Sequence, residues 1–277
     1  MSAPKVAVVG HVEWVQFARV AHVPRAGEVM HASEAFEEPA GGGAVAAVQL
    51  ARLAGAATLV TAFGKDDHGR RSLARLGELG VQVEASFEQE PTRRAVTLVD
   101  DAHERTITTF GRRLEPLAAL VSSSLEQIDG IYFTAGDAAA LEKARAATRV
   151  LVASPRARHA LGHGVELDAL VLSAGDAVER SEAGRAEGEA RLEVWTEGAK
   201  GGRFRTRDGE SGHWAAAPLP GEPRDSYGCG DSFAAGLTFG LAAGMEVRGA
   251  LALAARCGAM CATGRGPYEH QLTAADL

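Results

Sequence analysis

A short stretch near residue 230 combines a glycine turn with a carboxylate, which suits the handling of a phosphate group. Gly228 and Gly230 flank Cys229, and Asp231 follows just before an apolar run over 233–241. Glycines let the backbone turn so that several N–H groups point at one spot, and a helix starting there favours an anion. Asp231 would stand where an acceptor hydroxyl loses its proton. An ordinary strand-to-helix turn with a capping aspartate would give the same local pattern.

A second glycine cluster enters a helix-like segment near residue 42. Gly41 and Gly42 permit close backbone approach to a polar ligand. A dinucleotide fingerprint is excluded, because its glycines should follow a strand directly, whereas these follow the acidic, proline-containing residues 37–39. Glu13 is a further candidate for substrate binding, and a plain strand exit with a half-buried Trp14 explains its segment equally well.

Composition limits the classes of function. The chain has 277 residues, 46% hydrophobic and 23% charged, which predicts one globular domain over 1–277. The net charge of −7 argues against a nucleic-acid partner, because phosphate-backbone affinity needs concentrated Lys and Arg. No apolar run reaches the roughly 18 residues of a membrane span, and the N-terminus shows no signal-peptide profile, so we expect a cytoplasmic protein without a membrane partner.

The three cysteines, an odd number, do not suggest a disulfide framework. Cys257 and Cys261 have helical i, i+4 spacing, but their surroundings are apolar and offer no nearby histidine pair. We expect them to be small buried core residues rather than metal ligands.

Alternating segments predict the fold class. Short β-rich apolar runs alternate with Ala-, Leu-, Arg- and Glu-rich segments of helical periodicity. This alternation predicts an α/β fold, with a central, mainly parallel sheet covered by helices on both faces. The expected strands are 5–10, 57–64, 130–135, 150–154 and 167–173, and the expected helices are 43–54, 69–80, 138–148 and 156–161. Two regions, 15–38 and 93–112, break the alternation with β-prone pieces, which predict one small sheet projecting from the core.

The stretch 225–233 resembles the C-terminal signature of the ribokinase-like (PfkB) carbohydrate kinases, Asp-Thr-x-Gly-Ala-Gly-Asp-x-Phe. Ser226 replaces Thr and Cys229 replaces Ala, both small changes in volume. The resemblance implies that Asp231 is the catalytic base. It also implies an anion hole formed by the backbone N–H groups of Gly228, Cys229 and Gly230.

The glycine cluster near residue 42 resembles the N-terminal signature of the same family. Val45 stands where the family commonly has a substrate-facing Asn, and Val15 stands where many members have a sugar-gripping Asp. Glu13, Gly41 and Gly42 remain the expected substrate-binding residues. These departures indicate that the pocket is not the familiar ribose site.

Other motifs resemble the family's nucleotide and metal positions. Thr196, Gly198 and Gly201 match the turn Val-Thr-x-Gly-x-x-Gly, which meets the nucleotide, and Gly258 lies in a segment that resembles the helix flanking the adenine. The resemblance implies ATP and Mg²⁺ as cofactors. Asp176 is the expected metal residue, with Glu179 as an alternative register and Asp225 as a candidate for a monovalent cation such as K⁺.

Residues 95–109 resemble the family's Arg-Ala-Val hairpin, with His103 replacing the turn glycine. The resemblance implies a ribokinase-like fold in which 15–38 and 93–112 form a β lid over the substrate. The expected function is transfer of the ATP γ-phosphoryl group to a hydroxyl of a sugar or sugar-like molecule. A nucleoside acceptor and a non-catalytic nucleotide or metabolite sensor remain alternatives. Because lid sheets in this family often pair, a homodimer is also expected.

Overall fold

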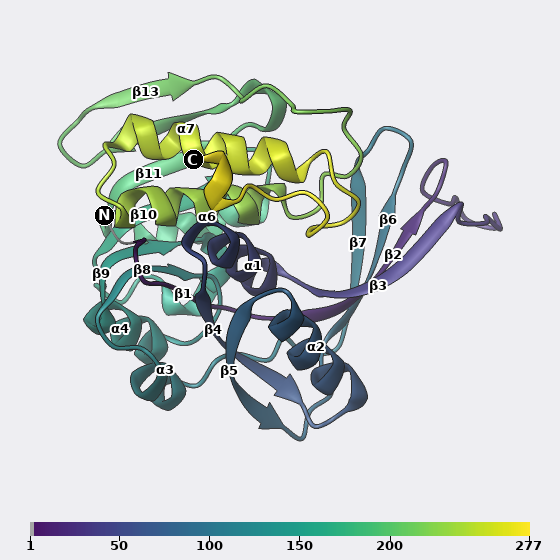
Figure 1. The fold of residues 1–277 in the computed structure, drawn as a ribbon, viewed down its shortest axis with the longest axis horizontal. Coiled ribbons are helices and arrows are strands. Elements are labelled where there is room, and N and C mark those ends of the chain that lie inside the picture. The colour runs from purple at the N-terminus through teal and green to yellow at the C-terminus, as the bar shows by residue number, and fades with distance from the viewer. Residues whose placement is uncertain (1–2) are drawn as a thin grey trace.

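A large sheet forms the centre of the molecule, and the computed structural model describes residues 3–277 (Figure 1). Its strands are β1 Val6–Val9, β4 Ala57–Gly64, β5 Val81–Glu88, β8 Ile128–Phe133, β9 Thr148–Ala153, β10 Leu167–Ser173, β11 Ala190–Thr196, β12 Gly202–Thr206 and β13 Ser211–Trp214. Their order is β13-β12-β11-β10-β9-β8-β1-β4-β5. All neighbours from β11 to β5 are parallel, and β12 and β13 are antiparallel. The predicted, mainly parallel sheet is confirmed.

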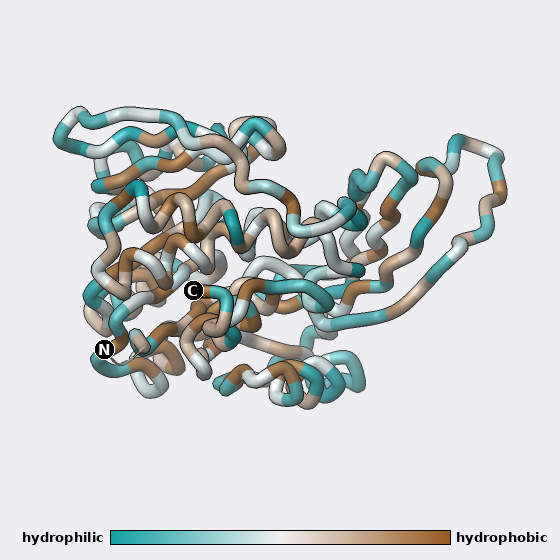
Figure 2. The backbone as a smooth tube through the Cα atoms, turned by 45° about the horizontal axis from the view of Figure 1, so that its top comes forward, coloured by the Kyte–Doolittle hydropathy of each residue, from teal (hydrophilic) through white to brown (hydrophobic). Residues whose placement is uncertain are grey.

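Helices cover both faces of this sheet, as predicted. They are α1 Gly42–Ala54, α2 Asp67–Glu78, α3 Ala118–Ser124, α4 Ala138–Ala147, α5 Ala177–Ala183, α6 Cys229–Ala242 and α7 Val247–Cys261. Side chains alternate along β1, so that Val6 and Val8 join the core that includes α1, α6 and α7, whereas Ala7 and Val9 join the core beneath α3 and α4. Figure 2 shows the hydrophobic segments concentrated in these strands and in the helices packed on them.

The two regions that break the alternation form one small four-stranded sheet, as predicted. Its strands are β2 Glu13–Arg19, β3 Glu34–Ala40, β6 Arg94–Val99 and β7 Arg105–Phe110, in the order β3-β2-β6-β7. This sheet projects from the body of the molecule (Figure 1). The β6–β7 hairpin exists although His103 replaces glycine, because His103 adopts a left-handed φ of 62° and Asp100 accepts bonds from two backbone N–H groups of the turn.

The helix predicted over 156–161 is wrong. Pro155–Ala160 forms a short 3₁₀ segment that is interrupted at Arg158, where φ is 48° and ψ is −109°. A positive φ at a residue with a side chain cannot continue a right-handed helix. The segment is therefore a tight turn at the carboxyl end of β9. Further 3₁₀ segments are Gly184–Ala186, Gly198–Lys200 and Ala274–Asp276.

Among the described residues, 3–277, no helix combines the length and the apolar character needed to cross a membrane.

Candidate active site

The N-terminal ends of α1 and α6 meet at the carboxyl edge of the large sheet. A Cβ built on Gly42, the first residue of α1, would lie 2.9 Å from Asp231 Oδ1 and 3.3 Å from Thr134 Oγ1. Asp231 lies in the first turn of α6, and Thr134 directly follows β8. Open α/β sheets bind ligands at this edge. The structure thus brings Asp231 and Gly42, two predicted site residues, into one place.

The start of α6 offers backbone donors to an anion. Gly228 has a left-handed φ of 81° and is the N-cap of the helix, where no side chain caps the first turn. The first-turn N–H groups of a helix have no partner within the helix, and the dipole adds a favourable field for negative charge. A Cβ on Gly230 would meet no atom within 4 Å, so the space beside this turn is open. The residues present therefore fit a phosphate group.

Asp231 has the electrostatic character of a base. Burial raises the pKa of its carboxyl to about 6, and the charges of Arg105 and Arg156 oppose this rise. Glu179 and Glu13 raise the pKa further by repulsion. A carboxylate with a pKa near the working pH is both ionised and basic enough to accept a hydroxyl proton.

Glu13 lies beside the glycines at the start of α1. A Cβ on Gly41 would lie 3.4 Å from Glu13 Cγ and 3.2 Å from His11 Cδ2. Glu13 Oε1 lies 3.2 Å from Arg93 Nη1 and 3.7 Å from His11 Nε2. The three predicted substrate-binding residues Glu13, Gly41 and Gly42 therefore lie close to Asp231.

The sequence interpretation missed four polar residues of this site. His11 follows β1, Thr134 follows β8 and Ser154 follows β9, and the Thr134 and Ser154 hydroxyls lie 3.1 Å apart. Arg93 precedes β6 of the small sheet. The first three could have been found by looking for polar residues at the carboxyl end of each predicted parallel strand.

Val15 and Val45, which replace the expected polar residues, are both fully buried in the apolar core. Val45 Cγ1 would lie 3.0 Å from a Cβ on Gly228, so Val45 supports the turn that begins α6. These two positions contribute packing rather than hydrogen bonds to an acceptor.

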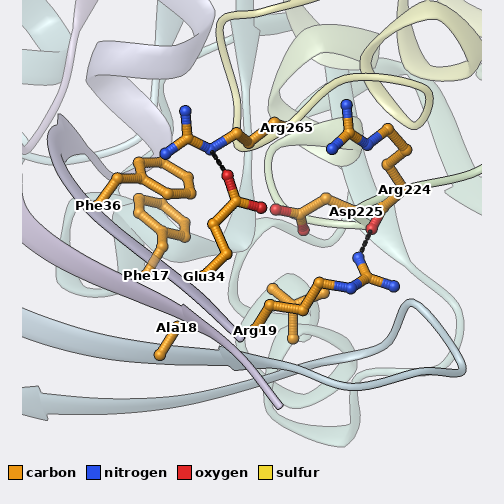
Figure 3. A pocket seen from close by; sticks show the side chains of 9 residues that line it. Phe17, Ala18, Arg19, Glu34, Phe36, Arg224, Asp225 and Arg265 are labelled. Carbon is orange, nitrogen blue, oxygen red and sulfur yellow. Dashed lines mark hydrogen bonds and ion pairs between the residues drawn. The ribbon is translucent and has the colours of Figure 1, made fainter. Parts of the chain in front are cut away.

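Asp225 stabilises the loop before α6. Its carboxylate accepts a 2.8 Å bond from the Tyr227 N–H and a 3.2 Å bond from the Gly266 N–H. Tyr227 in turn accepts a 3.1 Å bond from the Gly41 N–H at its phenol oxygen, which links the loop to α1. Figure 3 shows Asp225 beside a small pocket lined by residues of the small sheet and three arginine side chains, Arg19, Arg224 and Arg265.

Asp176 and Glu179 lie beyond β10 and share one arginine. Arg156 Nη2 lies 2.8 Å from Asp176 Oδ2, and Arg156 Nε lies 2.7 Å from Glu179 Oε1. The other oxygens of both carboxylates accept backbone N–H bonds. No group of three or more acidic, His or Cys ligands occurs within 3–277, so Asp225 does not join this pair. All four oxygens of the two carboxylates are therefore occupied, two by Arg156 and two by backbone N–H groups.

The predicted nucleotide residues lie in two places, the turn after β11 and the helix α7. Thr196 ends β11, and Gly198 and Gly201 have φ angles of 60° and 86° in the following turn. A Cβ on Gly201 would lie 2.0 Å from the Trp214 carbonyl oxygen, so this turn requires glycine. Gly258 lies on α7, where a Cβ would be 3.2 Å from the Cys229 carbonyl oxygen. Gly258 therefore allows α7 to approach the start of α6.

Cys229 is expected to act through its backbone. Its Sγ lies 3.8 Å from the Asp225 carbonyl oxygen, a weak contact, whereas its N–H belongs to the first turn of α6. We expect Cys229→Ala to change the affinity of this turn for an anion by less than about threefold, because alanine keeps the N–H. Calorimetric titration with inorganic phosphate tests this, and a loss above tenfold would show that the thiol itself takes part. Cys257 and Cys261 are fully buried, as predicted.

Comparison with known protein families gives a match over nearly the whole chain. A family model described as "pfkB family carbohydrate kinase" matches residues 3–274. No curated protein matches the chain.

Several solved structures resemble the fold. A ribokinase from Thermotoga maritima superposes with a TM-score of 0.75 at 18% identity, covering 99% of this chain and 97% of that one. A ribokinase from Arabidopsis thaliana, complexed with ribose and ATP, has the same TM-score, identity and coverage. A nucleoside kinase from Methanocaldococcus jannaschii has a TM-score of 0.73 at 16% identity, covering 99% of this chain and 97% of that one. These likenesses show a ribokinase-like fold.

Proposed function

Because this chain belongs to the pfkB family of carbohydrate kinases, we propose that it transfers the γ-phosphoryl group of ATP to a primary hydroxyl of a sugar or sugar-like acceptor, with Asp231 as general base. The observation that carries this proposal is the Asp231 carboxylate in the uncapped first turn of α6, beside Gly42 at the start of α1. A base and an anion site are thereby next to each other, as phosphoryl transfer requires.

The reaction would use the site as follows. The acceptor lies against Gly41, Gly42 and Glu13, with its reacting hydroxyl directed at Asp231. Asp231 accepts the hydroxyl proton as the oxygen attacks the γ-phosphorus, and the bond from that phosphorus to the ADP oxygen breaks. The N–H groups of Gly228, Cys229 and Gly230 donate to the oxygens of the transferring phosphoryl group. Thr196, Gly198, Gly201 and Gly258 would border the rest of the nucleotide.

Two cations belong to this proposal. Asp176 and Glu179 would hold Mg²⁺ through water, after Arg156 has left them, and Mg²⁺ would neutralise charge on the phosphates. Asp225 is the proposed residue for a monovalent cation such as K⁺. Dependence of the rate on each ion, measured by adding MgCl₂ or KCl to a chelated, salt-free enzyme, tests whether each cation is required.

The small sheet would serve as a lid. Arg105, at the start of β7, donates bonds of 3.1 Å to the Ser226 carbonyl oxygen and 3.3 Å to its hydroxyl, so the sheet already contacts the loop before α6. A closed lid excludes water, which limits wasteful ATP hydrolysis.

The small sheet would also form the interface of a homodimer. All residues of its edge strand β7 are exposed, including the apolar Ile107 and Phe110. An edge strand with exposed apolar side chains is a template for pairing with a second chain. Light scattering should give a mass near twice the 28.8 kDa of one chain, and a mass of one chain would contradict the dimer.

The test of the function is ADP formation with ATP and Mg²⁺ across a panel of sugars and nucleosides. Acceptor-dependent turnover identifies the acceptor class and decides between a sugar and a nucleoside. ATP binding without turnover for any acceptor would instead indicate a nucleotide sensor.

The pH dependence of the rate follows from the raised pKa of Asp231. The base must be ionised, so kcat/KM should fall about tenfold per pH unit below a pKa of about 6 and level off above it. Initial rates between pH 5 and 8, with a non-titrating acceptor, measure this decrease in kcat/KM. A rate that stays constant from pH 8 down to pH 5 would contradict the effect of burial.

A further inference from the structure

The loop before α6 is bonded to two different parts of the molecule. Its N–H groups bond to the body, because those of Arg224 and Asp225 donate bonds of 2.8 Å and 3.3 Å to the Ala262 carbonyl oxygen at the end of α7. The carbonyl oxygens of Arg224 and Ser226 instead accept bonds from side chains of the small sheet. The loop therefore connects the small sheet to the body directly before Gly228, where the turn proposed to bind phosphate begins.

Arg105 makes the contact that lies nearest to this turn in the sequence. It is the first residue of β7, and its Nη1 lies 3.1 Å from the Ser226 carbonyl oxygen and 3.3 Å from the Ser226 hydroxyl oxygen. Only Tyr227 separates Ser226 from Gly228, so a shift of the Ser226 backbone also shifts the turn. Tyr227 is buried and accepts a bond from the Gly41 N–H, which extends the effect to the start of α1.

A second arginine of the small sheet contacts the same loop. Arg19 ends β2, and its Nη1 donates a 3.0 Å bond to the Arg224 carbonyl oxygen (Figure 3). Its Nη2 lies 3.3 Å from His103 Nδ1 in the turn between β6 and β7. A guanidinium group has donors only, so His103 Nδ1 accepts this bond and holds the Arg19 side chain toward the loop. His103 therefore supplies a contact that a glycine at this turn could not make.

The strength of these contacts suits a sheet that opens and closes. Within residues 3–277, neither Arg19 nor Arg105 forms an ion pair with a carboxylate, and their bonds go to neutral partners. Hydrogen bonds between an arginine and a neutral oxygen or nitrogen are weaker than pairs with a carboxylate. Water can replace these partners when the small sheet moves away, and no carboxylate is left without its cation.

We infer that Arg105 and Arg19 are positioning residues, which fasten the small sheet to the loop before α6 and thereby align the Gly228 turn when the sheet is closed. Neither residue contacts the acceptor or the nucleotide in this inference. It rests on the proposed function, and it names how the position of the lid reaches the phosphate-binding turn. When the bonds break, the loop keeps its bonds to α7 and loses those to the small sheet, so opening and loss of alignment occur together.

The kinetic test uses Arg105→Gln. We expect kcat for phosphoryl transfer to fall roughly tenfold, while the Kd of ATP measured by calorimetry stays within about threefold. The fraction of ATP that is hydrolysed without transfer should rise at least about threefold, because an unfastened lid admits water. Comparing the amounts of ADP and of phosphorylated acceptor measures this fraction. Arg105→Lys should restore part of kcat, because its ammonium group can still donate to the Ser226 carbonyl oxygen.

Arg94→Gln is the matched control. Arg94 is the exposed first residue of β6 in the same small sheet, and its guanidinium carbon lies 6.0 Å from the centre of the Phe110 ring. Its side chain makes no hydrogen bond or ion pair with any residue of 3–277, so this variant removes the same charge without touching the loop. We expect kcat and the hydrolysed fraction to change by less than about twofold.

Hydrogen exchange of the protein without ligands tests the fastening independently of turnover. Exchange in the segments 222–228 and 94–110 should become roughly tenfold faster in Arg105→Gln and stay unchanged in Arg94→Gln. Arg19→Gln should accelerate exchange in the same two segments.

Several results would overturn the inference. These are unchanged exchange in Arg105→Gln, an unchanged fraction of hydrolysed ATP, or an equal loss of kcat in Arg94→Gln. If the parent protein formed no ADP with any acceptor, the kinase function would be rejected instead. Faster exchange of 222–228 in Arg105→Gln alone would in that case still support the fastening of this loop by the small sheet.

Discussion

Replacing Asp231 by asparagine should lower kcat by about 10³-fold while leaving the affinities for ATP and acceptor within about threefold. Asparagine has nearly the same shape but accepts no proton at neutral pH. The loss should appear in single-turnover rates of ADP formation, and calorimetry should show nearly unchanged binding of ATP.

The same substitution should stabilise the protein at pH 7. Burial raises the pKa of Asp231 from 3.8 to about 6 on folding, so the group favours the folded state below pH 3.8. This contribution to the free energy of unfolding is lost as the pH rises through 6. Above that pH the ionised carboxylate lowers the free energy of unfolding by at most about 3 kcal/mol. Neutral asparagine removes this cost, so the free energy of unfolding should rise at pH 7 and not at pH 3.

Asp225→Asn is compared with Asp231→Asn at a fixed KCl concentration, because Asp225 is the proposed residue for a monovalent cation. Asp225 lies in the same signature and is buried, but it accepts backbone bonds from Tyr227 and Gly266 rather than facing the acceptor. We expect this variant to unfold at a lower temperature and to lose less activity. If both variants lost kcat equally, Asp231 would have no separate role as a base.

The second large effect is expected at Gly230. A Cβ there meets no protein atom within 4 Å, so Gly230→Ala should fold normally. Its free energy of unfolding should rise by up to about 1 kcal/mol, because alanine favours a helix more than glycine does. The methyl group would nevertheless enter the space assigned to the transferring phosphoryl group. We expect kcat/KM for ATP to fall by roughly 10²-fold.

Comparing Gly228→Ala with Gly230→Ala separates the effect on activity from the effect on stability at the same turn. Gly228 has a φ of 81°, and a Cβ would lie 3.0 Å from Val45 Cγ1 and 3.1 Å from Pro267 Cβ. This variant should lose both stability and activity, whereas Gly230→Ala should lose activity alone. Thermal unfolding and steady-state kinetics of the two variants test the contrast. Full activity of Gly230→Ala would place the phosphate elsewhere.

The local pattern of apolar residues was sufficient to predict most strands of the large sheet. Buried parallel strands read as short apolar runs, and the predicted 167–173 agrees with β10. The turn at Arg158 could not be predicted, because its residue types permit a helix and only packing around the turn forces the positive φ. The turn at His103 could not be predicted either. Hydrogen bonds from backbone N–H groups to the Asp100 side chain stabilise there a left-handed backbone that glycine would otherwise adopt more easily.

By itself, the sequence determined the α/β fold class, the small projecting sheet and the grouping of Asp231 with two glycines, because these depend on local period and on neighbouring residues. Only the tertiary structure decided that Gly42, Glu13 and His11 lie near Asp231, and that Arg93 pairs with Glu13. The physical reason is that parallel strands distant in the chain end at one edge of a sheet, so their loops and charges meet there. Burial at that edge also sets the pKa of Asp231, which no local spacing reveals.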